Sequence, residues 1–366
     1  MSKPSAASAT EADATLPAAS SDSSHQRTRR LLLAGWETLI SVAATFLGLL
    51  FITFVIGRLM PADPLLAIVG ERASEETYNR IREELGLNLP IWRQFLIYAW
   101  NVVRGDFGMS VLTARPVSED ILRVFPATAE LSIVGIFIGV VAGVPLGVWA
   151  AVYRNSFLDH VMRVLGLVGY SVPIFWLGIM GLLVFYLELQ WVAGPGRLEV
   201  YLDGQVPTVT GMILVDSLIA GDWEVFNNAL SHIILPASLL GYYSLAYISR
   251  MTRSLMLEQL NQDYLLTARI KGMRQSRLIW RHAFGNILVP LITVIALSFA
   301  GLLEGSVLTE TVFAWPGIGR YITNALLNAD MNAVLGGTIV IGTVFIAINL
   351  LSDLLYRTLD PRTRRK

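Results

Sequence analysis

The sequence contains no cysteine and only four histidines among its 366 residues. Without cysteine, the chain has no disulfide, no thiolate for a metal and no cysteine nucleophile. The histidines are widely spaced, at His25, His160, His232 and His282, so no local histidine metal motif exists. Charge is also scarce, because charged residues make up 15% of the chain and the formal net charge is zero. This balance gives no indication of a nucleic-acid partner.

Several motifs of catalytic chemistry are missing from the sequence as well. It has no Gly-x-x-x-x-Gly-Lys-Ser/Thr phosphate loop, no His-Glu-x-x-His and no Gly-x-Ser-x-Gly. The chain is therefore predicted not to be an enzyme. Ser171 and Asp353 have no histidine nearby in the sequence, so an intramembrane enzyme would depend on distant partners and has little support.

Apolar residues, in contrast, are abundant. They make up 54% of the chain, and the mean hydropathy is +0.56, which is too high for an ordinary soluble protein. Six segments reach the length of about 20 residues that a helix needs to cross a bilayer. The sequence thus predicts an all-α membrane protein with six transmembrane helices, at approximately 31–57, 128–153, 162–190, 229–252, 286–308 and 335–357.

The distribution of lysine and arginine predicts the orientation of these helices. If the N-terminus is cytoplasmic, the cytoplasmic segments collect most basic residues, while the two later external loops hold one arginine each. The positive-inside rule then places both termini in the cytoplasm. Residues 1–30 are predicted to be a disordered tail and 358–366 a basic tail. A cleaved signal peptide is the competing interpretation of 31–57, but that run is about twice the usual length.

Residues 58–127 are too long to follow the charge rule for short loops. Within them, Glu71–Glu84 and Ile91–Val103 both show the pattern of a helix. We predict that this segment is a small external α-helical cap. The five-helix core follows at 128–357.

The stretch Asp263–Pro290 is a basic, amphipathic interruption between two apolar runs. In it, Ile270 and three arginines, Arg274, Arg277 and Arg281, recur at helical spacing, which predicts that the arginines lie on one helical face. Gly272 permits a bend or a close backbone approach. Such a segment can lie on a membrane surface or dock into a protein groove. Its basic residues would also satisfy the positive-inside rule or hold anionic lipid.

One pattern within this stretch carries a family resemblance. Tyr264-x-x-Thr267-Ala268-Arg269-x-Lys271-Gly272, followed by His282-Ala283-x-x-Asn286 and Pro290, resembles the cytoplasmic coupling loop of ABC-transporter permeases of the dipeptide/oligopeptide/nickel branch. Met60-Pro61-Ala62-Asp63-Pro64 and Arg104-Gly105-Asp106-Phe107-Gly108 resemble the same branch, so the resemblance covers nearly the whole chain from Leu31. The sequence departs from the branch at Gly285, where arginine is common.

The resemblance, closest to the B-type subunit of dipeptide permeases, implies a type I ABC importer permease fold in a bacterial inner membrane. The implied solute is a di- or oligopeptide, with nickel chelates, glutathione or opine-like compounds as alternatives. The implied partners are a second permease chain, two ATP-binding subunits that use ATP and Mg, and an extracytoplasmic solute-binding protein. The chain itself is expected to bind no cofactor and no metal. The resemblance assigns ATPase coupling to 263–285, through Tyr264, Thr267, Ala268, Arg269, Lys271, Gly272, Arg274, Arg277 and His282.

Two of the predicted spans contain unusual residues. Pro173 removes a helical hydrogen bond and predicts a kink, at which Tyr170 and Ser171 would line a solute path or merely form a structural bend. Glu304 is an ionisable residue in a span, so it would line the path or lie at the external interface. In an earlier span, glycines recur every four residues and predict a helix-packing seam, at Gly135, Gly139, Gly143 and Gly147.

The segment from Gly305 to Gly319 also resembles the family. Pro316 ends a helix, while Gly317 and Gly319 permit a tight non-helical turn. By resemblance, this external segment docks the solute-binding protein or forms an outer gate, through Glu310, Phe313, Trp315, Pro316, Gly317 and Gly319. A re-entrant structural loop that closes the pore mouth is the alternative, and the sequence does not separate the two.

A function of another class is an ion-coupled secondary transporter that uses Glu304 or Asp353 as its coupling carboxylate. Secondary transporters often contain an internal inverted repeat. This sequence shows none, and such a transporter has no evident need for the basic segment 263–285. The three separated family motifs therefore favour the permease.

Overall fold

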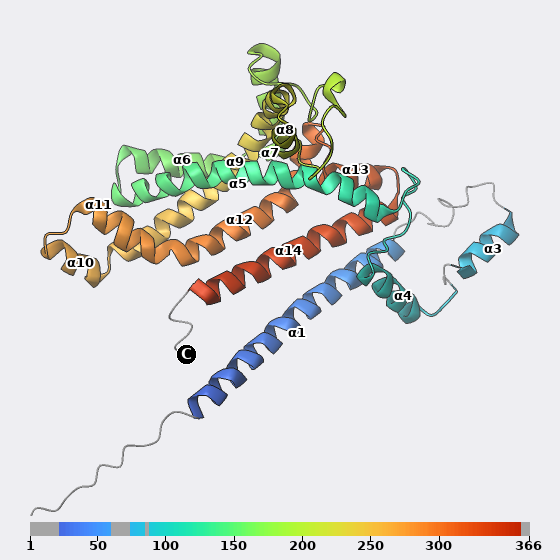
Figure 1. Cartoon of the computed structure of the whole chain (residues 1–366), viewed down its shortest axis with the longest axis horizontal. Coiled ribbons are helices and arrows are strands. Elements are labelled where there is room, and N and C mark those ends of the chain that lie inside the picture. Colours follow the sequence, from blue (N-terminus) through green and yellow to red (C-terminus); the bar gives the residue numbers. More distant parts are fainter. Residues whose placement is uncertain (1–21, 60–73, 85–87, 360–366) are drawn as a thin grey trace, which may run out of the picture. The chain divides into compact units, whose positions relative to one another are not determined.

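The computed structural model describes residues 22–59, 74–84 and 88–359. These residues form helices and no strand, apart from one isolated β-bridge between Met109 and Pro116. Figure 1 shows the helical elements along the chain. The prediction of an all-α protein is confirmed. Residues 1–21 of the predicted tail, 60–73 of the predicted cap and 360–366 of the predicted C-terminal tail lie outside the described residues.

Five helices are long and apolar enough to cross a membrane, and a bent helix pair raises the number to as many as six, within the described residues. The α-helices are α1 (Asp22–Leu59), α3 (Glu75–Glu84), α4 (Ile91–Val103), α5 (Val117–Val152), α6 (Phe157–Ser171), α7 (Ile174–Gly181), α8 (Ile213–Ala220), α9 (Trp223–Leu260), α10 (Asp263–Ile270), α11 (Gln275–Arg277), α12 (Phe284–Val312), α13 (Ile318–Leu327) and α14 (Met331–Leu359). Two π-helices, η1 (Leu182–Glu188) and η3 (Leu278–Ala283), and one 3-10 helix, η2 (Val200–Leu202), complete the elements.

The chain divides into two compact units, residues 1–47 and 48–366. The described part of the first unit is helical, and α1 begins at Asp22, earlier than the predicted start at residue 31. The prediction of disorder is therefore wrong for residues 22–30. The long apolar run that follows favours helix, and helix propagates from it into the short polar segment before it.

The second unit is built around α5, α9 and α12, which run alongside one another (Figure 1). The glycine seam of α5 lies against α9. A Cβ atom on Gly139 would collide with Ser244, and one on Gly147 would lie 2.6 Å from the Ser249 carbonyl oxygen. The predicted packing seam is confirmed, because glycine alone allows this close approach of two backbones.

The long helices of this unit extend beyond the apolar runs from which the spans were predicted. Helix α5 begins at Val117, well before the predicted span at 128, because its first turns are amphipathic rather than apolar throughout. Helix α9 begins at the N-cap Asp222, whose carboxylate accepts hydrogen bonds from the amides of Glu224 and Val225. The spans are thus longer than hydropathy predicts.

Helix α4 matches the predicted bounds Ile91–Val103 and packs on the second half of α1. The Tyr98 hydroxyl donates a hydrogen bond to Thr53, and the Phe95 ring meets Phe54 edge to face at 5.4 Å. Helix α3 is shorter than predicted and starts at Glu75. The two predicted helices within 58–127 therefore exist.

Candidate functional site

Segment 263–285 is anchored by apolar side chains that point inward. Leu265 of α10 and Leu278, Ile279 and Ala283 of η3 are buried in one cluster with residues of α5, α9 and α12. Complete burial of one leucine side chain contributes about 2 kcal/mol. A short helix such as α10 would be unstable alone, so this burial holds it against the ends of the long helices.

The chain between α10 and α11 makes a tight non-helical turn. Helix α10 ends at Ile270, and Gly272 has a φ of +78°, a backbone conformation that L side chains rarely adopt. The amide of Met273 donates to the Ala268 carbonyl, closing the end of α10. The prediction that Arg274, Arg277 and Arg281 continue one helical face from Ile270 is therefore wrong, because Gly272 breaks the helix first.

Most of the predicted coupling residues are exposed at the surface, namely Tyr264, Thr267, Arg269, Lys271, Gly272, Arg274 and Arg277, while Ala268 and His282 are partly buried. Tyr264 also ties α10 to its neighbours. Its hydroxyl accepts a hydrogen bond from Asn286 of α12 at 2.8 Å and donates one to Gln259 of α9 at 3.1 Å. The Tyr264 hydroxyl thus joins α10 to two of the long helices.

The exposed side of α10 is not uniformly polar. Leu266 is 57% exposed and Ile270 is 79% exposed, and they alternate with Arg269 and Lys271. Exposed large apolar side chains within a basic surface are typical of a contact for another protein. The anchored, partly apolar surface of α10 can therefore serve as a docking element.

A second candidate site surrounds Glu310, near the other end of α12. This carboxylate is completely buried. It accepts hydrogen bonds from the Thr128 hydroxyl at 2.7 Å, the Ser306 hydroxyl at 2.9 Å and the Arg320 amide at 3.0 Å. A buried carboxylate is tolerated only when its oxygens are satisfied in this way. We call Glu310 with Thr128, Ser306, Trp315, Gly317 and Gly319 the Glu310 cluster.

The two glycines of the Glu310 cluster provide space for the carboxylate. A Cβ atom on Gly317 would collide with the carboxyl group of Glu310, and one on Gly319 would lie 2.9 Å from it. Gly317 has a φ of −98° and caps α13, and Gly319 lies inside α13. The prediction that Gly319 forms part of a non-helical turn is wrong, because the backbone there is helical.

The connection between α12 and α13 is fixed to the rest of the protein by further contacts. The Trp315 indole donates to the Ala127 carbonyl at 2.9 Å, and the Ile318 amide donates to Thr128 at 2.8 Å. Among the predicted docking residues, Glu310, Phe313, Trp315, Gly317 and Gly319 are buried and Pro316 is exposed. In this conformation, Pro316 is the member of the set that a partner could touch directly.

The connection between η1 and α9 is held on this cluster by an ion pair. The Arg197 guanidinium donates two hydrogen bonds to Glu130 of α5, and it lies 5.9 Å from the Trp315 ring centroid. The second Glu130 oxygen accepts from the Leu214 amide at 2.7 Å. The sequence analysis missed Glu130, although an acidic residue in a span was the same signal that singled out Glu304.

The predicted path residues lie around a sharp bend. Helices α6 and α7 meet at 99° where Pro173 interrupts them, so the predicted kink is present. Pro173 lines a cavity of about 340 Å³ together with Gly301 and Gly305. Ser171 and Glu304 are exposed, and the side chain of Tyr170 lies outside the described residues. Their role in a path stays a prediction.

A third polar cluster, which the sequence analysis also missed, joins α6 to α9. Asp159 is completely buried, and its carboxylate accepts hydrogen bonds from Arg253 at 2.7 and 3.0 Å and from Arg163 at 3.2 Å. Ser156 caps α6 and accepts the Asp159 amide, so a Ser-x-x-Asp pattern was the available signal. No local sequence pattern pointed to Arg253 as its partner.

Among the described residues, no group of three or more His, Cys, Asp or Glu side chains could hold a metal.

Comparison with known protein families gives two matches that together span most of the chain. Residues 143–365 match the family "Binding-protein-dependent transport system inner membrane component". Residues 36–132 match the N-terminal region of the same kind of membrane component. The second match ends close to where the first begins.

Curated relatives match over a similar extent. The probable D,D-dipeptide transport system permease protein DdpB of Escherichia coli is 43% identical over 90% of this chain and 96% of its own. The dipeptide transport system permease protein DppB of Escherichia coli is 44% identical over 89% of this chain and 96% of its own. Among solved structures, the inward-facing MetNI methionine ABC transporter matches with a TM-score of 0.49 and 16% identity, covering 66% of this chain and 96% of the other.

Proposed function

The chain belongs to the family of inner-membrane permease components of binding-protein-dependent transport systems, and from this premise we propose that it carries di- or oligopeptides into the cell. The observation that supports this solute most directly is the 43–44% identity, over nearly the full length, to permeases named for dipeptide transport. The secondary-transporter alternative is not favoured, since the relatives belong to a different class of transporter.

The proposed partners follow from what the chain has and lacks. It contains no phosphate loop, so separate ATP-binding subunits would supply ATP hydrolysis with Mg. Up to six spans would make half of a pathway, which calls for a second, similar permease chain. A solute-binding protein outside the membrane would deliver the peptide.

The coupling step is proposed to run through segment 263–285. Its apolar side is buried against α5, α9 and α12, and its other side exposes Leu266, Arg269 and Ile270. When ATP binding closes the two ATPase subunits, α10 would move with them as a rigid body. The Tyr264 hydrogen bonds to α9 and α12 would pass that motion to the spans.

The orientation of the chain is part of the same proposal. Segment 263–285 would face the cytoplasm, as the positive-inside rule requires for its basic residues. The connection from α12 to α13 would then face outward, because it follows α12 at the opposite end from η3. The Glu310 cluster would hold the outer ends of α5, α12 and α13 together while the opposite end moves.

The experiment is reconstitution of the chain with the products of its neighbouring genes. The tagged chain is purified and the complex is assayed in liposomes for ATP hydrolysis and peptide uptake, with each candidate binding protein in its peptide-loaded and empty forms. We expect two ATPases and a second permease in the complex, with hydrolysis stimulated by the loaded binding protein.

Two other outcomes would overturn the proposal at different levels. Stimulation by a loaded binding protein that carries nickel chelate or glutathione instead would change the solute and leave the importer intact. A chain that purifies alone and moves solute on an ion gradient would contradict the importer and make Glu304 the residue to pursue.

A further inference from the structure

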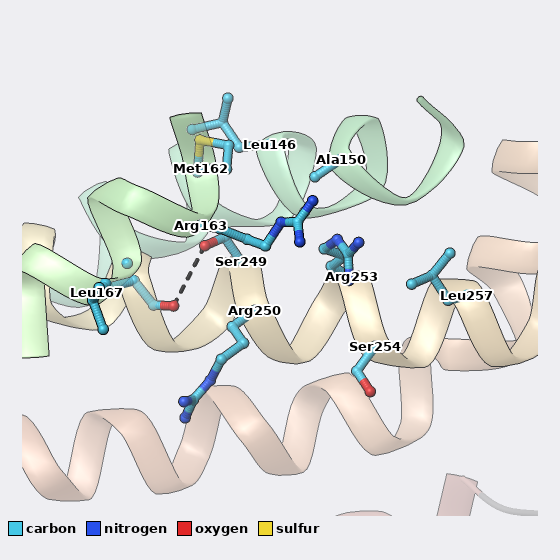
Figure 2. Close-up of a pocket in the computed structure, with 13 residues that line it drawn as sticks. Leu146, Ala150, Met162, Arg163, Leu167, Ser249, Arg250, Arg253, Ser254 and Leu257 are labelled. Carbon is cyan, nitrogen blue, oxygen red and sulfur yellow. Dashed lines mark hydrogen bonds between the residues drawn. The ribbon is translucent and has the colours of Figure 1, made fainter. Parts of the chain in front are cut away.

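A cavity with arginine and serine side chains in its lining lies between α5, α6 and α9. It has a volume of about 520 Å³. Three arginines line it, Arg163, Arg250 and Arg253, together with Ser249 and Ser254. No acidic side chain is among the described residues that line it. We call this cavity the arginine pocket, and Figure 2 shows it in close-up.

The charge at the arginine pocket is not balanced. Asp159 lies behind the lining and is the shared partner of Arg163 and Arg253, so one carboxylate faces two guanidinium groups. In Figure 2 the guanidinium groups of Arg163 and Arg253 lie next to each other, while Arg250 extends away from them toward another side of the cavity. Two adjacent cations that share one anion leave a positive charge for a further anion to neutralise.

The guanidinium groups are arranged for an oxyanion with several oxygens. Each guanidinium has five N–H donors, and the Asp159 carboxylate occupies only some of them. The side chain of Arg163 is 51% exposed and that of Arg253 is 24% exposed. Arginine in this setting favours phosphate, since its planar fork offers two parallel donors.

The remaining lining of the pocket is apolar. It includes Leu146 of α5 and Met162 and Leu167 of α6. The helices around the pocket are membrane-spanning candidates, because α5 and α9 are candidate spans and α6 belongs to the bent pair. A free phosphate would gain nothing from these walls. An amphiphile would place its charged headgroup on the arginines and its chain along the leucines.

The position of the pocket along the helices fits the headgroup layer of a membrane. Its lining comes from the end of α5, the middle of α6 and the last third of α9, which is the end from which α10 follows. Basic pockets between transmembrane helices on the cytoplasmic side are suited to anionic lipid headgroups. From the charge, the apolar walls and this position, we infer that the arginine pocket binds an anionic phospholipid, with the phosphate on Arg163 and Arg253.

A phospholipid bound in this way would contact Arg163 of α6 and Arg253 of α9 at once, close to segment 263–285. Because Arg253 also holds the buried Asp159, replacing it would leave that carboxylate without its main partner and destabilise the fold. Arg163 is the better residue to change. Arg154 provides a matched control, since it is an exposed arginine close in sequence that does not line the pocket.

The test is phosphatidylglycerol binding to the complete purified complex in detergent, measured by native mass spectrometry against phosphatidylcholine. We expect retained phosphatidylglycerol in the wild type and about fivefold weaker retention in Arg163→Gln, because one basic residue near the membrane surface contributes a factor of that order. Arg154→Gln should retain the lipid like the wild type. Leu167→Asn, which alters only the apolar wall, should also weaken retention.

Three results would overturn the inference. Equal loss in Arg163→Gln and Arg154→Gln would mean a diffuse charge effect rather than a site. Competition by soluble glycerophosphate as strong as by phosphatidylglycerol would mean a free-anion site that does not use the apolar walls. No selective retention by the wild-type complex would mean that the arginine pocket does not select an anionic lipid.

Discussion

Segment 263–285 and the Glu310 cluster stand near opposite ends of α12 and are built in opposite ways. Segment 263–285 buries Leu265 and Leu278 and exposes its charged side chains. The Glu310 cluster buries a carboxylate with two hydroxyl groups and leaves Pro316 at the surface. One region thus has free polar groups to offer a partner, whereas the polar groups of the other are already satisfied inside the protein.

The glycines show the same contrast. Gly272 has no atom within 4 Å of a hypothetical Cβ, so its requirement is the positive φ alone. Gly317 has an ordinary φ, and its requirement is the space occupied by the Glu310 carboxylate. A family motif therefore does not reveal whether its residues meet a partner or hold the fold. Substitutions that separate stability from transport should reveal the difference.

The largest effect on stability is expected from Glu310→Ala. The change leaves the Thr128 hydroxyl and the Arg320 amide without their acceptor, while the Ser306 hydroxyl keeps the Leu303 carbonyl at 3.1 Å. Each of these two unpaired groups costs about 1–3 kcal/mol, so the total loss should be about 2 kcal/mol or more. The measurement is the amount of chain in the membrane and its thermal unfolding in detergent.

Glu304→Ala is the matched control for Glu310→Ala, because it removes the same side chain from an exposed position on the same helix. It should leave the unfolding temperature unchanged, and its transport rate then reports on the path separately. Similar unfolding temperatures for the two variants would show that the Glu310 cluster does not hold the fold.

A smaller loss of stability is expected from Gly317→Ala. The new methyl group must displace a carboxylate that three hydrogen bonds hold in place, and such overpacking costs about 1–3 kcal/mol. Gly305→Ala, at a helical glycine with open space around it, should be neutral or slightly stabilising. Thermal unfolding of both variants in one detergent compares them directly, and equal values would refute the role assigned to Gly317.

Gly272→Arg should have the opposite effect to the substitutions in the Glu310 cluster. It should abolish function with little loss of stability. A non-glycine residue in this conformation costs about 1–2 kcal/mol, and relief of that strain would reorient α10. We expect normal amounts of chain and complex without stimulation of ATP hydrolysis by the loaded binding protein. The control is Gly285→Ala, an exposed helical glycine in the same segment with nothing nearby. Normal stimulation in a normal amount of complex would rule out the coupling role of Gly272.

The smallest effect is expected at Asp216, in the connection between η1 and α9. There the stability of the fold should depend on pH. Burial raises the pKa of Asp216, but hydrogen bonds from the backbone and hydroxyl of Thr210 and from the Gly211 amide outweigh it and lower that pKa. A carboxylate whose folded pKa lies below its unfolded value of about 3.9 stabilises the fold above that pH, and the contribution is lost as pH falls through the folded pKa.

Asp216→Asn should therefore be less stable than the wild type near neutral pH. This difference in stability should shrink as the pH falls below about 4. Asp203→Asn, at an exposed aspartate of the same connection, should show no such convergence. Parallel unfolding curves for wild type and Asp216→Asn across this range would contradict the lowered pKa.

The sequence was sufficient for the parts of the fold that depend on local pattern. Hydropathy located the spans, the four-residue spacing of Gly135 to Gly147 predicted the seam with α9, and Pro173 predicted the bend. These features need no knowledge of distant residues. Polar helix ends, such as the first turns of α5, were missed because hydropathy does not register them.

The candidate sites were predictable in part. Most of the predicted coupling residues of segment 263–285 are exposed, but the predicted single arginine face does not form, because the positive φ of Gly272 interrupts the helix. The clusters around Asp159 and Glu310 join residues that lie far apart in sequence, Asp159 with Arg253 and Glu310 with Thr128. Such pairs depend on how the helices pack, which one sequence does not specify.

The most direct test of this account is to ask what touches α10 in the working complex. Because the chain has no cysteine, Ile270→Cys introduces a single site for a photo-activatable maleimide, at a side chain that is 79% exposed. Val200→Cys, at a position that is 92% exposed in the connection before α9, is the control. We predict that light links Ile270→Cys to an ATPase subunit and does not link Val200→Cys to one. A labelled Ile270→Cys complex that retains transport but forms no link to an ATPase would contradict the account.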